Sequence, residues 1–442
     1  MPLRIKASLS LSRPTNEVNG KVVLFSSPIG IPLCCIFRET KVTGTNKAKC
    51  SCKIVSVLIS HISHLECPQC RRKHSPDTRG TYCVCGSPLF VIYDLVGVRE
   101  SLGKGEFPSD MNSMWRYSQL LPVKSPSCVV SLGEGWTPLI LSRRLGKHLG
   151  LQMLRIKDEA QNPTTSFKDR GLSAAISRHY ELGAKEFALP SAGNAAVSAS
   201  AYAAAAGLKA HIFMPDDTPE PFFHQCEFFG AETMRVKGTI AEAAKAMGDQ
   251  NEDWTDLSTT KEPYRVEGKK TLGFEICEQM GWSVPDAIIC PTGGGTAIIG
   301  IWKAFDELEA IGLIGPERPR MYAAQSGGCA PIVRAIEKGT DDIEPWVNGE
   351  TEAFGLRVPN PFAGRLILHS IRNSGGSAVA VADQEIETTR RTAAKLEGID
   401  FCPESAVGIC GLWNLIESGK IDYDEDVVLL NTGSGVRYTN MK

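Results

Sequence analysis

The sequence predicts an α/β fold in which parallel β-sheets are covered by helices on both faces. From about residue 150 onward, short apolar strands alternate with helical stretches. This alternation is typical of βαβ units, in which the strands lie parallel and the connecting helices cover the sheet. At 442 residues, the chain is long enough for two or three domains with ample core.

The alternating elements can be placed along the chain by their apolar runs and by the turns between them. Short apolar runs bounded by polar or glycine-containing turns favour buried strands over helices. The expected elements, in chain order, are strand 187–190, helix 195–206, strand 210–214, helix 219–229, strand 233–236, helix 240–247, strand 287–290, helix 297–308, strand 321–324 and strand 427–430.

Composition argues against several classes of protein. The formal net charge of −2 argues against a nucleic-acid partner or a membrane-surface role. No apolar run reaches about 18 uncharged residues, so no transmembrane helix is expected. Of the 15 cysteines, eight lie in the first 85 residues and seven are scattered singly among apolar segments. That distribution favours a reduced, intracellular protein with one metal cluster over a disulfide scaffold.

Residues 1–60 differ in composition from the rest of the chain. They carry nine Lys and Arg residues against only Glu17 and Glu39, and they are rich in Ser and Thr. This composition is typical of an organelle transit peptide, and it fits a disordered leader or a wrongly predicted first exon equally well. We therefore expect a cytoplasmic protein, or a plastid or mitochondrial one if the leader is genuine.

Two cysteine pairs in the segment 61–95 form a candidate metal site. Twelve residues separate the pair Cys67 and Cys70 from the pair Cys83 and Cys85. Two such pairs at the tips of tight turns can supply four thiolates to a tetrahedral, structural zinc. The second pair is closer than the usual CxxC, although Gly86 makes its turn flexible. An empty relic of such a site and plain structural cysteines are the alternatives.

A lysine stands in the stretch Asn-Pro-Thr-Thr-Ser-Phe-Lys-Asp-Arg-Gly, residues 162–171, just before a run of small residues. Asn, Pro and Ser cap or break helices, so Lys168 is expected at or near a helix start. The positive field of a helix N-terminus lowers the cost of a neutral amine. A neutral amine is what Schiff-base chemistry needs, whereas a solvated surface lysine is the alternative.

Three turns follow predicted strands and supply polar or anion-binding groups. The first, Pro291-Thr-Gly-Gly-Gly-Thr296, precedes a helix and can turn its backbone N–H groups toward a phosphate. It has neither the P-loop sequence nor the GxGxxG spacing of a dinucleotide site. The others are Ser191-Ala-Gly-Asn194 and Asn431-Thr-Gly-Ser-Gly435, at the sheet edge where ligands of open α/β sheets bind. The alternatives are a close-packing glycine turn for the first, a plain helix N-cap at Asn194 for the second and an ordinary turn for the third.

Pyridoxal phosphate requires a lysine amine, a phosphate-binding loop and polar partners for its ring. The chain offers all three, and its phosphate-binding loop lacks the motifs of a nucleotide site. From about His64 to its end, the chain also resembles the threonine synthase family, of the tryptophan-synthase-β class (fold type II) of pyridoxal-phosphate enzymes. The cysteine segment resembles the N-terminal segment of some bacterial members. The matching motifs are Gly133-Glu-Gly-Trp-Thr-Pro-Leu139 and residues 162–171, 191–194, 291–296 and 431–435.

The resemblance implies two open, mostly parallel sheets flanked by helices, with the cofactor in the cleft between two domains. The large domain would comprise residues 96–180 and 273–442, and a smaller inserted domain would comprise residues 181–272. The leader (1–60) and the zinc-ribbon-like segment (61–95) would precede them. The expected assembly is a homodimer.

The resemblance also implies roles at the cofactor. Lys168 would bond its aldehyde as a Schiff base, with Phe167 beside it. Asn194 would hydrogen-bond the ring hydroxyl, and Thr432 would be a neutral partner for the pyridine nitrogen. The phosphate would be held by Gly293, Gly294, Gly295 and Thr296.

The implied reaction converts O-phosphohomoserine and water to threonine and phosphate, with Lys168 shuttling protons. The substrate's phosphate needs a second anion site, which we expect from Thr260, Lys261 and Arg265, with Ser191 nearby. A solvated basic loop is the alternative for the segment 258–270.

Two residues depart from the family pattern. Ala192 and Ala195 stand where the family commonly has threonine, and each lost donor could cost about 1–3 kcal/mol beside an anionic substrate. Ser191, Ser198 and backbone N–H groups are candidates to compensate; otherwise the substrate differs. The alternative functions are a serine/threonine ammonia-lyase, another β-replacement enzyme, or a non-catalytic regulatory protein that retains the fold.

Overall fold

The computed structural model describes residues 60–78, 82–103, 107–108, 110–250 and 252–438, and also the backbone of three strands nearer the N-terminus. The chain divides into two units, Met1–Val57 and Leu58–Lys442, and each is described by itself. In the first unit, β1 (Val22–Ser26), β2 (Pro32–Arg38) and β3 (Lys49–Ser51) form an antiparallel sheet in that order. The rest of the predicted leader lies outside the described residues.

The second unit is built around a six-stranded sheet in the order β15-β14-β13-β16-β8-β7. Every neighbouring pair is parallel except β7 with β8. The strands are β7 (Leu139–Leu141), β8 (Met153–Asp158), β13 (Ala287–Pro291), β14 (Arg320–Ser326), β15 (Ser377–Val381) and β16 (Asp426–Asn431).

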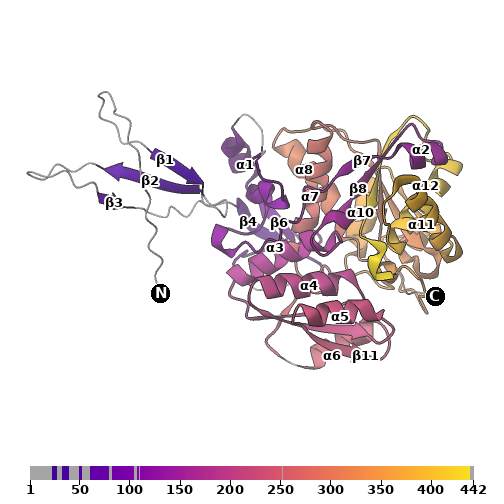
Figure 1. Cartoon of the computed structure of the whole chain (residues 1–442), viewed down its shortest axis with the longest axis horizontal. Helices are drawn as coiled ribbons and strands as arrows, with labels where there is room; N and C mark the ends of the chain where they lie inside the picture. The colour runs from indigo at the N-terminus through magenta and orange to yellow at the C-terminus, as the bar shows by residue number, and fades with distance from the viewer. Residues whose placement is uncertain are drawn as a thin grey trace, which may run out of the picture. The chain divides into compact units, whose positions relative to one another are not determined.

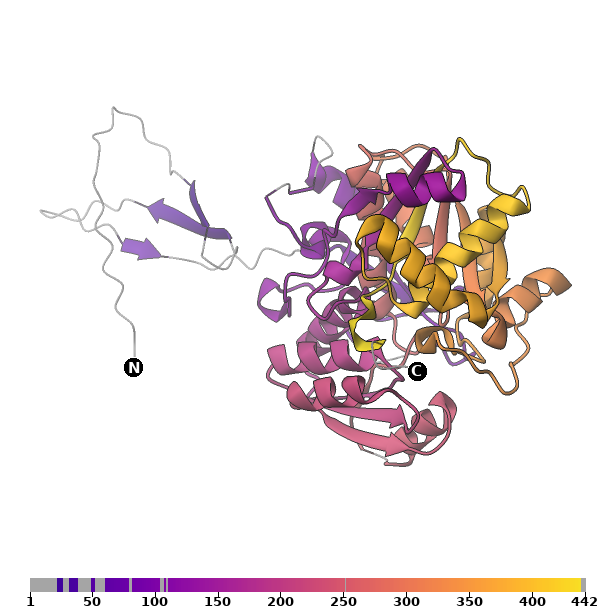
Figure 2. The same cartoon turned by 45° about the vertical axis from the view of Figure 1, so that its right-hand side comes forward.

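Helices cover both faces of this sheet because its central strands β13 and β16 are mostly apolar and send successive side chains to opposite faces. Ile289 and Leu429 pack into one core cluster with α2 (Arg143–Leu149), α11 (Asp383–Glu397) and α12 (Pro403–Glu417). Ile288 and Val428 belong to the cluster on the other face, with the helices α7 (Tyr264–Gln279), α8 (Thr296–Ala310), α9 (Pro331–Lys338) and α10 (Gly364–Asn373). In Figure 2, the orange and yellow helices of residues 383–417 lie in front of the sheet.

A second, smaller sheet has four parallel strands in the order β11-β10-β9-β12. It falls within residues 181–272, between α3 (Lys168–Glu181) and α7 in the chain, and forms the lower part of the body in Figure 1. Its elements are β9 (Glu186–Pro190), α4 (Asn194–Ala205), β10 (Lys209–Pro215), α5 (Glu220–Phe228), β11 (Glu232–Val236), α6 (Ile240–Asp249) and β12 (Thr255–Asp256).

The helix α3 (Lys168–Glu181) packs across α7, and glycine makes this close crossing feasible. A Cβ atom on Gly268 of α7 would lie 1.9 Å from the carbonyl oxygen of Arg170 on α3. Any larger residue at this position would therefore push apart the two helices that join the sheets.

The cysteine segment forms a third, antiparallel sheet in the order β5-β4-β6, which leads into α1 (Leu95–Leu102). Its strands are β4 (Ile62–Glu66), β5 (Lys73–His74) and β6 (Phe90–Tyr93). The predicted α/β class with two open, mostly parallel sheets is confirmed. Among the described residues, no helix has the length and apolar character needed to cross a membrane.

Candidate active site

A cavity of about 400 Å³ lies where the carboxyl ends of strands from both sheets face each other. The turns after β9 and β13 line it, as does Thr432, which directly follows β16. The predicted residues that line it are Phe167, Lys168, Ser191, Asn194, Thr260, Lys261, Gly293, Gly294, Gly295, Thr296 and Thr432. Segments more than a hundred residues apart in the sequence therefore meet in one place.

Lys168 is the first residue of α3, as the sequence predicts. Its Nζ atom lies 4.4 Å from the centre of the Phe167 ring. Burial, reinforced by the positive charge of Arg265, lowers the pKa of the Lys168 amine from 10.5 to about 8. A useful fraction of the amine is therefore neutral near physiological pH, as bond formation with an aldehyde requires.

The loop that precedes Lys168, residues 162–167, is hydrogen-bonded to the turn that follows β16. The backbone N–H of Phe167 donates to the carbonyl of Thr432 over 3.0 Å, and that of Ser434 donates to the carbonyl of Thr165 over 3.0 Å. The Thr432 hydroxyl has neutral neighbours, Ser405 Oγ at 3.4 Å and Cys402 Sγ at 3.5 Å. Burial raises the pKa of the Cys402 thiol, which keeps it uncharged. This environment suits a neutral partner for a pyridine nitrogen.

Asn194 is the first residue of α4, and its amide is oriented by an arginine that the sequence reasoning missed. Arg437 donates from Nη1 to Asn194 Oδ1 over 2.9 Å and to Thr165 Oγ1 over 2.8 Å. Its Nη2 donates to the carbonyl of Thr164 over 2.8 Å. Because the amide oxygen accepts from Arg437, the Nδ2 group of Asn194 is left as the donor for a ligand.

The turn after β13 has no room for side chains, which is what a phosphate cradle requires. A Cβ atom on Gly293 would lie 2.8 Å from the carbonyl of Gly355, and one on Gly295 would lie 2.3 Å from Ile367. Gly295 has a φ of +78°, and α8 begins at the next residue. The N-terminal N–H groups and the dipole of α8 therefore lie directly behind the loop. The loop thus fits the phosphate of pyridoxal phosphate.

The predicted substrate residues divide into two groups. Ser191, Thr260 and Lys261 line the cavity, whereas Arg265 does not. Arg265 lies in the first turn of α7, is 1% exposed and donates from Nη1 to the carbonyl of Leu257 over 2.7 Å. Its Nε has no partner among the described residues. A solvated loop is excluded for Arg265, because this part of the segment 258–270 is buried helix.

Glu404 is a second residue that the sequence reasoning missed. It lines the cavity, is 5% exposed, and lies in the first turn of α12, where an acidic residue is common for reasons of helix stability alone. Its Oε1 accepts hydrogen bonds from the backbone N–H of Gly355 at 2.8 Å and from the hydroxyl of Tyr438 at 2.9 Å. Its Oε2 is buried without a partner in the described part of the chain.

The four predicted metal ligands lie together at the start of the second unit. The Sγ atoms of Cys67 and Cys85 are 3.5 Å apart, those of Cys70 and Cys83 are 3.6 Å apart, and all four lie within 4.8 Å of one another. A tetrahedral zinc with bonds of about 2.3 Å separates its sulfurs by about 3.8 Å. Disulfide-bonded sulfurs would lie about 2.05 Å apart. The cluster therefore has the size of a metal site.

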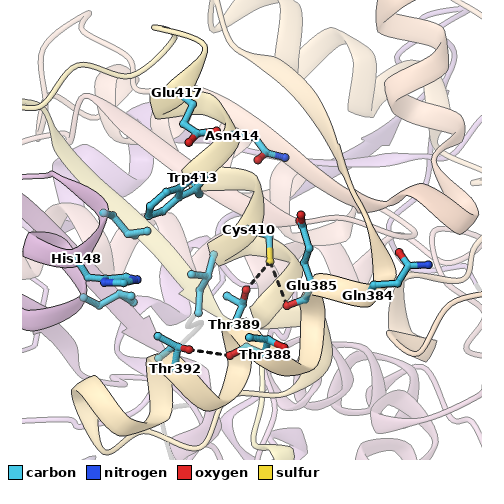
Figure 3. Close-up of a pocket in the computed structure, with 14 residues that line it drawn as sticks. His148, Gln384, Glu385, Thr388, Thr389, Thr392, Cys410, Trp413, Asn414 and Glu417 are labelled. Atoms are coloured by element: carbon cyan, nitrogen blue, oxygen red, sulfur yellow. Dashed lines mark hydrogen bonds between the residues drawn. The ribbon is translucent and has the colours of Figure 1, made fainter.

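A larger cavity, of about 480 Å³, lies among α2, α11 and α12 (Figure 3). Some of its polar groups bond to one another, as in the 3.1 Å contact between Cys410 Sγ on α12 and Thr389 Oγ1 on α11. Its charged lining residues include Glu385 and Glu417 but no lysine or arginine. It also holds none of the predicted site residues, so it does not suit a phosphate-bearing cofactor.

Comparison with known proteins indicates the same cofactor, pyridoxal phosphate. Residues 130–433 match the model of a family described as "Pyridoxal-phosphate dependent enzyme". The chain is 39% identical over 373 residues to the threonine synthase of Methanocaldococcus jannaschii, covering 84% of this chain and 92% of that protein. It is 36% identical to the threonine synthase of Bacillus sp. (strain ULM1), covering 73% and 89% respectively.

Solved structures also share the fold. Maize serine racemase aligns with a TM-score of 0.58 at 22% identity, covering 68% of this chain and 88% of that one. Diaminopropionate ammonia lyase from Escherichia coli aligns with a TM-score of 0.59 at 20% identity, covering 75% and 91%. At these identities the likeness concerns the fold alone.

Proposed function

The chain belongs to the family of pyridoxal-phosphate dependent enzymes, and we propose that it is a threonine synthase, a lyase that converts O-phosphohomoserine and water to threonine and phosphate. One observation carries the proposal. A single cavity places the part-buried amine of Lys168 with a glycine cradle for the cofactor's phosphate and, in addition, with Thr260 and Lys261 for a second anion. A substrate that carries its own phosphate accounts for both sets of anion-binding groups.

The residues present would hold pyridoxal phosphate at both ends. Lys168 would bond its aldehyde, Gly293 to Thr296 its phosphate, Asn194 its ring hydroxyl and Thr432 its nitrogen. The bound cofactor supplies an electron sink that makes protons on the neighbouring substrate carbons acidic. The neutral hydroxyl of Thr432 at the ring nitrogen would leave the pyridine largely unprotonated, which would moderate that electron withdrawal.

Lys168 would also be suited to moving protons when its amine is free. With a pKa of about 8, its amine can take a proton from a substrate carbon and return it to a neighbouring one near neutral pH. Lys261 and Thr260 would hold the substrate's phosphate until it leaves, while Ser191 at the N-terminus of α4 would meet the carboxylate. Arg265 stays a predicted substrate-binding residue. It does not line the cavity, but its positive charge helps to lower the pKa of Lys168.

A substrate panel on the full-length holoenzyme tests this function. We expect equal amounts of phosphate and threonine from O-phosphohomoserine, measured by phosphate assay and amino-acid chromatography, and little keto acid from threonine or serine. A lyase acting on threonine or serine needs no second phosphate site. Robust keto acid without phosphate release would establish the ammonia-lyase alternative. No turnover and no visible absorbance from bound cofactor would support the non-catalytic alternative.

We also propose that Cys67, Cys70, Cys83 and Cys85 hold one structural zinc per chain. Metal analysis of the purified protein should find one equivalent of zinc. We expect Cys70→Ser and Cys85→Ser to lose it and to unfold at lower temperature. Both side chains are exposed, so replacement leaves no cavity. Cys128→Ser, outside the cluster, is the control and should keep its zinc. A zinc-free wild-type protein would contradict the proposal.

The homodimer and the cellular compartment stay predictions. Chromatography with light scattering would measure the first. Localisation of the full-length chain and of a chain lacking residues 1–60 would test whether the basic leader directs the protein to an organelle.

A further inference from the structure

The proposed substrate carries a phosphate and a carboxylate, so the positive charges around the cavity matter. Three cationic residues line it in the part of the chain that the structure describes: Lys168, Lys261 and Arg357. Lys168 is committed to the cofactor. Lys261 and Arg357 are therefore the lining cations that remain for the substrate's anionic groups, and no sequence motif pointed to Arg357.

Arg357 lies in the segment between α9 and α10, and residues 354–362 of this segment line one side of the cavity. The Arg357 side chain is 17% exposed. It reaches across to the small sheet. Its Nη1 and Nη2 donate to the two carboxylate oxygens of Asp217, over 2.8 and 3.0 Å. Asp217 lies in the turn between β10 and α5. The ion pair thus bridges the two sheets beside the cavity.

This pairing is the two-pronged geometry in which a guanidinium binds a phosphate. The Asp217 carboxylate occupies the donors that a phosphoryl group would use, and its side chain is 49% exposed. Ion pairs of such exposure are weak because water and salt screen them. A phosphate carries more negative charge than a carboxylate, so an incoming phosphorylated substrate can displace Asp217 from Arg357.

We propose that Arg357 binds the phosphoryl group of the substrate and that Asp217 holds the guanidinium in its place until the substrate arrives. This inference rests on the proposed function, since it names the residue that selects a phosphorylated substrate. Arg357 and Lys261 together form the phosphoryl site, and Asp217 is a competing anion.

Substitutions of Arg357 and of Asp217 should change KM for O-phosphohomoserine in opposite directions. Arg357→Gln should raise KM for O-phosphohomoserine about 10- to 100-fold with a much smaller change in kcat, because a charged hydrogen-bond donor to the substrate is lost. Arg357→Lys should recover part of the loss. Asp217→Asn should lower KM about 2- to 5-fold, because the competing anion is removed. A purely structural bridge would instead be damaged by either change.

A matched control is Arg365→Gln, which breaks the exposed pair of Arg365 with Asp342 outside the catalytic cavity and should leave KM unchanged. Inhibition by L-threonine, which keeps the carboxylate and lacks the phosphate, should weaken no more in Arg357→Gln than in this control. An equal loss for threonine and for O-phosphohomoserine would assign Arg357 to the carboxylate and overturn the proposal. A raised KM in Asp217→Asn would also overturn it.

Calorimetric titration of the holoenzyme with inorganic phosphate separates this inference from the proposed function. Absence of phosphate release by the wild-type enzyme contradicts the function. Weaker binding of inorganic phosphate by Arg357→Gln than by Arg365→Gln supports the phosphoryl site even in that case. Equal binding by the two variants overturns the phosphoryl site, whatever the wild-type enzyme catalyses.

Discussion

Replacing Lys168 by alanine is expected to abolish the visible absorbance band of the lysine-bound cofactor and to lower kcat by at least about 10²–10⁴-fold, the usual contribution of a positioned acid–base group. The same amine bonds the cofactor and moves the substrate's protons, so one substitution removes both functions. Absorbance spectra and phosphate release measure the two effects separately. Lys261→Ala is the matched control. It should keep the band and lose only substrate affinity.

A surviving band in Lys168→Ala would assign the cofactor bond elsewhere. The second buried amine near this position is Lys269, whose Nζ lies 4.1 Å from the centre of the Phe167 ring and donates to the Phe167 carbonyl. Burial, with the charge of Lys168, lowers the pKa of Lys269 well below its ordinary value. The double substitution would then remove the band.

The pH dependence of cofactor capture follows from the same residue. Only the neutral amine attacks an aldehyde, and the pKa of Lys168 is lowered to about 8. The rate at which the cofactor-free protein captures pyridoxal phosphate should therefore rise with pH and level off above about 8. A rise that continued toward 10.5 would describe a solvated lysine and would contradict the assignment.

The site residues that the sequence predicted are those whose positions follow from the order of strands, turns and helices along the chain. Lys168, Asn194 and Thr296 each begin a helix, and Thr432 directly follows a strand. In open α/β sheets such positions lie at the ligand-binding edge. The apolar strands were recognisable for a similar reason, whereas the edge strand β15 has only two buried residues, Ala378 and Val381, and was not identified.

The missed residues depend on contacts between distant segments. Arg437 meets Asn194 across 243 positions, and Arg357 meets Asp217 across 140. No spacing rule connects such pairs. Arg265 shows that a sequence motif can also predict a contact that the fold does not form. Its motif predicted a substrate contact, but its place on α7 turns Nη1 to the carbonyl of Leu257. Ser198, a candidate to compensate for Ala192 and Ala195, lies outside the cavity lining, whereas Ser191 is part of it.

A second large effect is expected from the buried ion cluster that anchors the lysine helix. Arg170, two residues after Lys168, donates to Glu159 and to Glu275, and Lys157 donates to Glu275 over 2.8 Å. All four side chains are 0% exposed and their charges cancel. Glu275 also accepts from the backbone N–H of Trp136 over 2.7 Å. The cluster therefore joins α3, α7 and the segment 133–139.

Glu275→Gln keeps the shape of the side chain and removes its charge, leaving one buried positive charge without compensation. Breaking a buried pair in this way costs about 3–5 kcal/mol of the free energy of unfolding, because the remaining charge cannot be solvated. Urea unfolding at pH 7 measures this loss of stability. Adding Lys157→Met restores neutrality, so the double variant should be more stable than Glu275→Gln alone. A double variant less stable than the single one would refute this electrostatic explanation.

The effect should also fade in acid. Burial alone would raise the pKa of Glu275, but the charges of Arg170 and Lys157 outweigh it and lower the pKa from 4.5 to about 2. A carboxyl group with a depressed pKa stabilises the fold above its unfolded-state pKa, and this contribution is lost as pH falls through the folded-state value. The difference in unfolding free energy between wild type and Glu275→Gln should therefore be constant above about pH 5 and shrink steadily from there toward pH 2. A difference that did not change with pH would mean that the glutamate stabilises the fold by packing and neutral hydrogen bonds instead of by charge.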